Sequence, residues 1–234
     1  MKSNKYFIGI DTETTNALID EKDALDLSQS LCYDIGWAVL NKKGKIYEKK
    51  SFVVAEIFLD KALMKDALFF EKVPTYWKEI KEGKRTLAPI TKIWKAFCVD
   101  RKKWNCKVVF AHNAFFDYRA LNNTLRFITG SKYRFFFPYR LEIWDTLKMA
   151  RDTIAKEESY CEFCQKNNYL TKHKTPQNRL TAEILFRYLS GDNGFIESHT
   201  GLEDVEIESK IFAYCMGLNK KMRKTLFNRK RVFC

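Results

Sequence analysis

Residues 5–15 read KYFIGIDTETT. The apolar run before Asp11 predicts a buried strand over residues 5–11. Side chains alternate between the two faces of a strand, so Asp11 and Glu13 are expected to project to the same side at its carboxyl end. Two such carboxylates repel each other and are costly to desolvate, and a bound cation is the usual way to stabilise them. The pair alone is also compatible with two solvated loop acids.

A second acidic position follows a second strand. Residues 107–111 (KVVFA) predict a short strand, and a helix is expected from there to about Thr129. Asn113 is well placed to cap this helix. Asp117 falls in the first turn, one turn before Leu121, and is therefore expected to face inward. The helix dipole offers a structural explanation for this acid, and a metal ion offers a functional one.

The third acidic position lies near the C-terminus, in residues 198–215 (SHTGLEDVEIESKIFAYC). Thr200–Glu203 matches the capping box S/T-x-x-E, which predicts that a helix begins there. The buried stripe of this helix is expected at Ile207, Ile211 and Cys215. Asp204 precedes Ile207 by three residues and continues that stripe. His199 lies in the loop just ahead, from which an imidazole can reach into a site.

The remaining chain predicts a mixed α/β sheet in one domain. Further strands are expected over residues 33–40, 46–54 and 141–147, the last running into a helix. Two or three helices are expected across about 57–101, and the chain beyond 147 reads as helical, with a turn at GDNG (191–194).

Composition favours an intracellular protein with a polyanionic partner. A chain of 234 residues suits one sizeable domain, and its net charge of +13 favours nucleic acid first and an anionic membrane surface second. No signal-peptide pattern or apolar run of ~18 residues is present, and seven cysteines at irregular spacing do not form a disulfide framework. We therefore expect a cytoplasmic location and no membrane association.

Two further segments leave alternatives open. Residues 219–234 hold seven Lys and Arg and no acid, which fits either a solvated basic arm or a phosphate-contacting one. Cys161 and Cys164, with His173 and Cys215 downstream, have a spacing found in zinc sites, but no second ligand pair follows at the spacing that such a site needs. Packing in the core is the prediction for these cysteines.

Three ordered motifs resemble those of the DnaQ-like exonucleases, a family that includes proofreading subunits of bacterial replicative polymerases. DTETT (11–15), HNAFFD (112–117) and the pair His199 and Asp204 resemble its motifs in the histidine-bearing DEDDh subtype. WDTLKMAR (144–151) is similar to the segment between the last two motifs. The resemblance spans about residues 5–216. It implies an RNase H-like fold with a five-stranded mixed sheet and an antiparallel second strand, in a domain of residues 1–218 followed by a basic tail of residues 219–234.

The resemblance also implies roles for the matching residues. Asp11 would bridge two divalent ions, Glu13 and Asp204 would complete the shell of one, and Asp117 would hold the other. His199 would be the general base. Mg²⁺ or Mn²⁺ is expected, because an all-oxygen site suits hard cations. Contacts to nucleic acid are expected from Thr14, Asn113 and Phe115.

Three features depart from the family pattern. Asn16 stands where glycine is frequent, residues 17–31 make the first loop longer than usual, and Val205 replaces a small residue. None of these changes removes an expected metal ligand.

We therefore predict a metal-dependent 3′–5′ exonuclease that releases nucleoside 5′-monophosphates from single-stranded or frayed DNA ends. A DNA polymerase or replication complex is a possible partner implied by the family. The alternatives are an exoribonuclease of the same fold, a catalytically silent nucleic-acid-binding or polymerase-accessory domain, and a binder of anionic membranes that uses residues 219–234.

Overall fold

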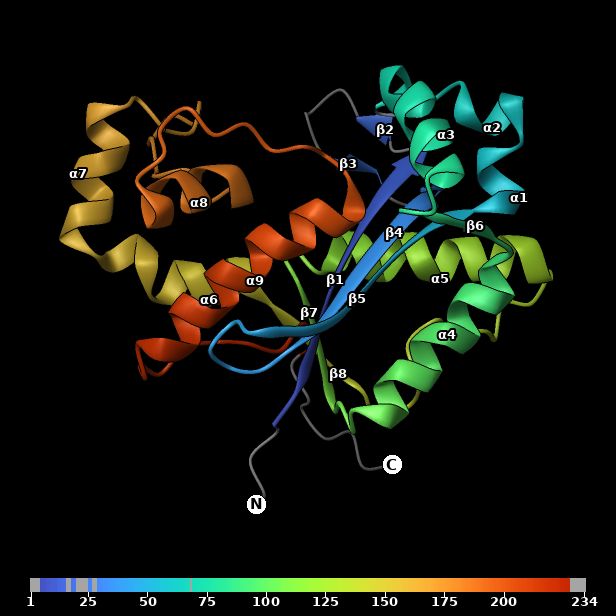
Figure 1. Ribbon diagram of the computed structural model, residues 1–234. Helices are drawn as coiled ribbons and strands as arrows, with labels where there is room; N and C mark the ends of the chain where they lie inside the picture. The colour runs from blue at the N-terminus through green and yellow to red at the C-terminus, as the bar shows by residue number, and fades with distance from the viewer. Residues whose placement is uncertain (1–4, 16–17, 20–24, 27–28, 68, 228–234) are drawn as a thin grey trace.

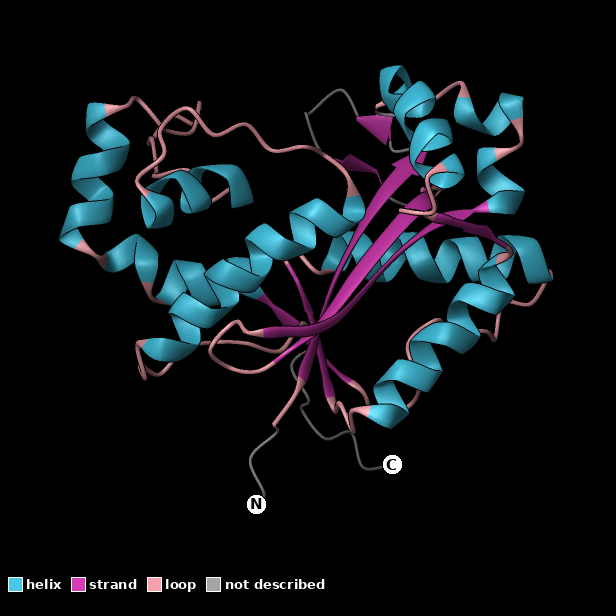
Figure 2. Ribbon diagram, in the orientation of Figure 1, coloured by secondary structure: helices cyan, strands magenta, loops and turns pink. Residues whose placement is uncertain are grey.

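The computed structural model describes residues 5–15, 18–19, 25–26, 29–67 and 69–227. This part of the chain folds into a mixed six-stranded sheet with helices on both faces (Figure 1 and Figure 2). The strands of the sheet are β1 (Phe7–Thr15), β4 (Leu31–Leu40), β5 (Ile46–Val54), β6 (Thr86–Ala88), β7 (Val108–Ala111) and β8 (Glu142–Asp145). A separate short pair consists of β2 (Leu18–Ile19) and β3 (Leu25–Asp26).

Eleven helical segments are present in the described residues. The first group is α1 (Ala55–Phe58), α2 (Lys61–Met64), η1 (Phe70–Lys72), α3 (Val73–Lys81), α4 (Ile90–Lys103) and α5 (Phe115–Thr129). The second group is α6 (Thr146–Asp152), η2 (Ile154–Lys156), α7 (Glu158–Lys166), α8 (Ala182–Ser190) and α9 (Gly201–Gly217).

The sheet has the order β6-β5-β4-β1-β7-β8. β4 is antiparallel to β1 and to β5, whereas β7 is parallel to β1 and to β8. The predicted α/β class, with an antiparallel second strand and helices on both sides, is confirmed. The count of five strands is wrong by one, because β6 pairs parallel with β5 at the edge. β6 lies within the span of about 57–101, where the sequence predicts two or three helices and no strand.

β1 lies at the centre of the sheet and carries the first motif. Every described residue of β1 is buried except Asp11, which is half-buried. A strand covered on both faces shows no polar alternation, which explains the continuous apolar run before Asp11. β1 continues to Thr15, so Glu13 belongs to the strand and lies opposite Asp34 of β4.

Two hydrophobic cores lie on opposite faces of the sheet. One core joins the sheet to α1, α3, α4 and α5. The other joins it to the helices from α6 to α9. Figure 1 shows α4 and α5 on one side of the strands and α6 to α9 on the other. The α9 stripe of Ile207, Ile211 and Cys215 is buried in the second core, as predicted.

The N-terminus of α9 makes an unusually close approach to β4. A Cβ atom added to Gly36 would lie 2.3 Å from the backbone nitrogen of Leu202, so only glycine fits there. Gly201 faces Gly36 from the helix side, with its own added Cβ 2.8 Å from the Gly36 nitrogen. This contact fixes the start of α9 over the strand that pairs with Asp11 and Glu13.

Part of the predicted basic tail lies along β8. Thr225 bridges to Trp144, the Leu226 N–H donates to the Ile143 carbonyl (2.8 Å), and Arg223 forms an ion pair with Asp152 (2.8 Å). The division into a domain of residues 1–218 and a tail of residues 219–234 stays a prediction.

Asn16 and most of the 17–31 loop fall outside the described residues. No helix in the described ranges combines the length and the apolar character that crossing a membrane requires.

Candidate active site

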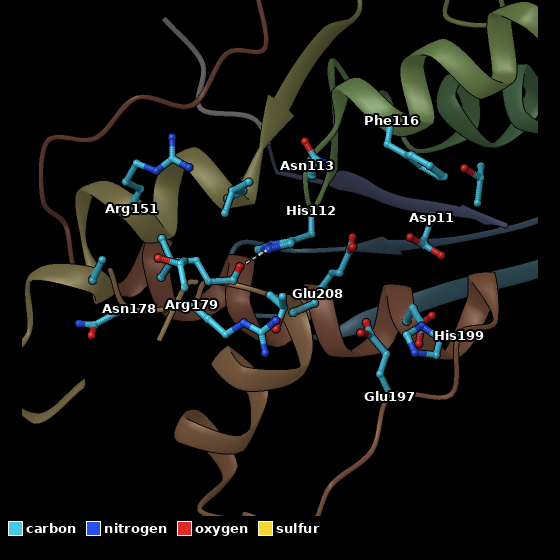
Figure 3. Close-up of a pocket in the computed structure, with 18 of the residues that line it drawn as sticks. Asp11, His112, Asn113, Phe116, Arg151, Asn178, Arg179, Glu197, His199 and Glu208 are labelled. Carbon is cyan, nitrogen blue, oxygen red and sulfur yellow. Dashed lines mark hydrogen bonds between the residues drawn. The ribbon is translucent and has the colours of Figure 1, made fainter. Parts of the chain in front are cut away.

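A cavity of about 720 Å³ opens at the carboxyl end of the central strands. Ligand sites in open α/β sheets commonly occupy this edge. Its walls come from β1, the segment after β7, α6, α9 and the chain on both sides of α8. Figure 3 shows side chains from these separate segments pointing into one space.

Four of the five predicted catalytic residues line this cavity. They are Asp11, Glu13, His199 and Asp204. Glu13, His199 and Asp204 each offer one ligand atom, and these three atoms lie within 4.8 Å of one another. Segments separated by nearly 190 residues in sequence therefore meet in one cavity.

Asp117, the fifth predicted residue, lies behind the cavity wall. It is in the first turn of α5 and is only 2% exposed. The Thr12 hydroxyl donates a hydrogen bond to Asp117 Oδ1 (2.9 Å). Asp117 is close enough to Asp11 to raise the pKa of that carboxyl, so the two acids belong to one electrostatic cluster.

Asp204 is oriented by the chain that precedes its own helix. The Thr200 N–H donates to Asp204 Oδ2 (2.9 Å), and the Ser198 hydroxyl donates to Oδ1 (3.2 Å). The helix begins after Thr200, as predicted, but the expected capping box is not formed. Asp204, rather than Glu203, accepts from the Thr200 N–H, whereas Glu203 accepts from the Thr200 hydroxyl and from Arg85 (3.1 Å).

A buried ion pair holds the start of α9 in place. Asp34 of β4 accepts hydrogen bonds from the Gly201 N–H (2.9 Å), the Tyr76 hydroxyl (2.9 Å) and Arg85 (2.7 Å). Asp34 is fully buried, and Arg85 is 4% exposed. Burial of an ion pair is tolerated when hydrogen bonds satisfy both groups, and this one ties β4 and α3 to α9.

His199 is held by contacts on two sides. Its backbone is in the left-handed region (φ 49°), which a histidine adopts only when the surroundings support it. The Phe69 ring stacks on the imidazole, with centroids 4.4 Å apart and an interplanar angle of 9°. The Lys72 ammonium donates to the carbonyls of Ser198 and His199, the latter at 3.5 Å. Partial burial, and then the positive charge of Lys72, lower the pKa of His199, which favours the neutral imidazole near pH 7.

The acids of the site are hard to ionise together. Burial first, and repulsion from neighbouring acids second, raise the pKa values of Asp11 and Glu13 well above their usual range. Burial raises the pKa of Asp117 and of Asp204 to about 7. A divalent cation among these groups would relieve both costs.

Two further acids line the cavity that the sequence analysis did not select. Burial raises the pKa of Glu197 to about 8 and that of Glu208 well above its usual range. Glu208 is 2% exposed, and its Oε2 has no hydrogen-bond partner among the described residues. Glu208 follows Asp204 by one helical turn, so the spacing could have identified it. Glu197 precedes the helix and has no comparable signal.

The three predicted nucleic-acid contacts have different surroundings. Asn113 lines the cavity, but its predicted capping role is wrong, because α5 starts at Phe115 without a side-chain cap. Asn113 is in the left-handed region, and its N–H donates to Asp145 (3.2 Å). Thr14 is fully buried. Phe115 is 42% exposed and lies outside the cavity, which its neighbour Phe116 lines instead.

The candidate zinc residues have different surroundings. Cys164 is fully buried in the core around α7, where burial raises the pKa of its thiol. Cys161 accepts a hydrogen bond from the Asn178 side chain (3.3 Å). His173 lines the cavity, whereas neither of these two cysteines does.

Comparison with known proteins shows the fold. No protein-family model matches the sequence, and no curated protein matches it. The chain is similar to a 3′-exonuclease solved for its 3′-end-specific recognition of a histone mRNA stem-loop, with TM-score 0.58 and 13% identity over 94% of this chain and 66% of that one. It is also similar to cell-death related nuclease 4, with TM-score 0.54 and 10% identity over 94% and 66% of the two chains.

A moderately thermophilic exonuclease I from Methylocaldum szegediense also matches, with TM-score 0.55 and 13% identity over 93% of this chain and 41% of that one. The present chain therefore spans less than two thirds of the length of these three solved chains. At these identities the likeness concerns the backbone arrangement alone, and the chain shares the α/β fold of these nucleases.

Proposed function

We propose that the protein is a metal-dependent 3′–5′ exonuclease that removes nucleoside 5′-monophosphates from single-stranded or frayed nucleic-acid ends. The observation that carries this proposal is the meeting of Glu13, Asp204 and His199 within 4.8 Å, beside Asp11 in one cavity. The nuclease fold supports it, because the three solved nucleases cover 93% or more of the chain.

The residues present fit divalent metal ions. Carboxylate oxygens are the ligands that Mg²⁺ and Mn²⁺ prefer, and buried acids without a neutralising partner need a cation. We assign Asp11, Glu13 and Asp204 as direct ligands. Asp117, which accepts a hydrogen bond from Thr12, would contribute its negative charge from behind Asp11 or contact a metal ion through water. Bound ions would supply a hydroxide near neutral pH and stabilise the negative charge that develops on the phosphate.

The protein's own groups position the reactants and move a proton. His199, whose pKa is lowered, is neutral near pH 7 and can accept a proton from the attacking water. Phe69 and Lys72 keep its ring and backbone in place. Phe116 and Asn113 line the same cavity and can contact the terminal nucleotide.

Matched oligonucleotides test polarity and sugar preference together. DNA and RNA strands of one sequence, labelled at the 5′ end, are incubated with the protein and Mg²⁺. We expect a ladder that shortens from the 3′ end, with DNA degraded faster. Release of the labelled nucleotide first would contradict the polarity. Faster loss of the RNA would favour the exoribonuclease, a candidate supported by the similar exonuclease that recognises a histone mRNA stem-loop.

A catalytically silent binding domain is the alternative from another class. It predicts that the strand binds but stays intact at every Mg²⁺ and Mn²⁺ concentration. The gathering of Asp11, Glu13, Asp204 and His199 in one cavity, with Asp117 behind Asp11, favours the enzyme. A polymerase or replication complex as partner, and residues 1–218 as the catalytic domain, remain parts of the proposal that rest on the sequence resemblance.

A further inference from the structure

The cavity has a second end that differs chemically from the acidic one. This end is built by α6 and by residues 167–181, the connection between α7 and α8. Its polar lining consists of Arg151, Thr171, His173, Gln177, Asn178 and Arg179. Figure 3 shows Arg151, Asn178 and Arg179 beyond His112, on the side away from Asp11 and His199.

The two arginines at this end form no ion pair with the described residues. Arg151 and Arg179 have no carboxylate of the described chain within ion-pair distance, whereas Arg85, Arg187 and Arg223 each have at least one. Both guanidinium-bearing residues are exposed and line the cavity. A guanidinium is always charged and presents paired N–H donors that match a phosphate. The position of the two residues therefore favours an anionic ligand.

The wall that carries Arg179 is fixed by its backbone. The Arg179 N–H donates to the Tyr169 carbonyl (2.9 Å), and the Thr171 N–H donates to the Gln177 carbonyl (2.8 Å). The Tyr160 hydroxyl donates to the Arg179 carbonyl. His112 Nε2 lies 2.7 Å from the Leu180 carbonyl and joins this wall to the second sequence motif. The basic end is thus held in a set position relative to the acids.

We propose that the basic end is a phosphate subsite that holds a backbone phosphate of the substrate strand, away from the phosphate being hydrolysed. This inference rests on the proposed function, because the acidic end would take the scissile phosphate through its metal ions. A nucleic-acid strand carries a phosphate on every nucleotide, so one strand can place separate phosphates at both ends of the cavity. The neutral donors Gln177 and Asn178 can complete the contacts of the remote phosphate.

The subsite makes affinity depend on strand length. An oligonucleotide can contact both ends of the cavity, whereas a nitrophenyl ester of thymidine 5′-monophosphate carries one phosphate and can contact only one. The test compares the parent with Arg151→Ala, Arg179→Ala and the double variant. The matched control is Arg134→Ala, an exposed arginine outside the cavity.

For an oligonucleotide, we expect each cavity variant to raise KM on the order of tenfold. For the one-phosphate ester we expect a smaller rise in KM. Equilibrium binding of a fluorescent single strand to metal-free protein gives an independent readout. The double variant should reduce the salt dependence of log Kd by about 0.7, the contribution of one phosphate contact on a single strand. Arg151→Lys with Arg179→Lys should keep most of this salt dependence.

Two results overturn the subsite. In the first, the cavity variants have the same oligonucleotide KM and the same salt dependence of log Kd as Arg134→Ala. In the second, KM rises equally for the oligonucleotide and the ester, which would assign the arginines to binding of the scissile phosphate or to folding. If the parent cleaves neither substrate, the proposed function fails. The binding measurement then decides the subsite alone.

Discussion

Phe69 and Phe70 are adjacent aromatic residues with different surroundings. Phe69 stacks on His199 and lines the cavity, whereas Phe70 is 53% exposed and lies outside it. Phe69→Ala removes the surface that orients the imidazole, and small displacements of a catalytic group can cost about 10²-fold in rate. We expect the single-turnover cleavage rate to fall ~10- to 100-fold. Phe70→Ala is the matched control, and equal rates in the two variants would contradict the positioning role.

The acids of the cavity make metal-free stability depend on pH. Asp117 and Asp204 have pKa values of about 7, against an ordinary value of 3.8. The folded protein then binds more protons than the unfolded chain between these values, so stability is present at low pH and is lost as pH rises. We expect the urea concentration at the unfolding midpoint of the metal-free protein to decrease as the pH is raised from about 4 to 8. Mg²⁺ should reverse the loss at pH 8; a midpoint that rises over this range without metal would contradict the assignment.

Among single residues, the sequence predicted the acids of the motifs and missed the side chains that surround them and contact His199. Asp11, Glu13 and Asp204 were predicted to face inward because strand alternation and helical spacing are local properties, and all three line the cavity. Glu208 obeys the same helical spacing and could have been found with Asp204. Phe69 and Lys72 come from a segment with no motif, and only the tertiary fold brings them to His199.

The contact between β4 and α9 depends on a buried charged pair. Arg85 bonds to Asp34, Ser51, Glu79 and Glu203, and it is 4% exposed. Arg85→Met leaves Asp34 buried without its cation, which typically costs about 3–5 kcal/mol. The free energy of unfolding from urea titration measures this cost.

The control for this prediction is an exposed pair. Arg223 bonds to Asp152 (2.8 Å) with two thirds of its side chain exposed, and such exposed pairs contribute little to stability. Arg223→Ala should therefore change the free energy of unfolding much less than Arg85→Met does. Similar losses in the two variants would show that the Arg85 network does not anchor α9.

Elements with a periodic pattern were predicted well, and short or irregular ones were not. β4, β5, β7 and α9 were placed within a few residues, because each buries a continuous face. β6 has three residues, too few to show a period, and it forms because it can pair with the β5 edge. The capping box is not formed, because the Glu203 carboxylate accepts from the Thr200 hydroxyl and from Arg85, which is distant in sequence, while Asp204 takes the Thr200 N–H.

The whole molecule places a strongly acidic site inside a basic protein. The net charge of +13 favours binding of a polyanion, while the buried acids of the cavity repel it unless cations are bound. The order of three motifs was enough to predict the fold class, because each falls at the end of a central element. The second wall of the cavity, residues 167–181, has no motif, so the basic end became visible only in the structure.

The proposed activity is hydrolysis of nucleic acid at the cavity, where the acids around Asp11 would bind divalent metal ions. The most direct measurement is release of nucleoside 5′-monophosphate from a labelled single strand by the parent and by Asp11→Asn, with Mg²⁺ and after chelation. We predict release by the parent with Mg²⁺ only, and a rate at least about 10³-fold lower for the variant. The metal-free variant should melt no lower than the parent, because a repelling buried charge is removed. Equal release by parent and variant, or release that persists after chelation, would contradict the account.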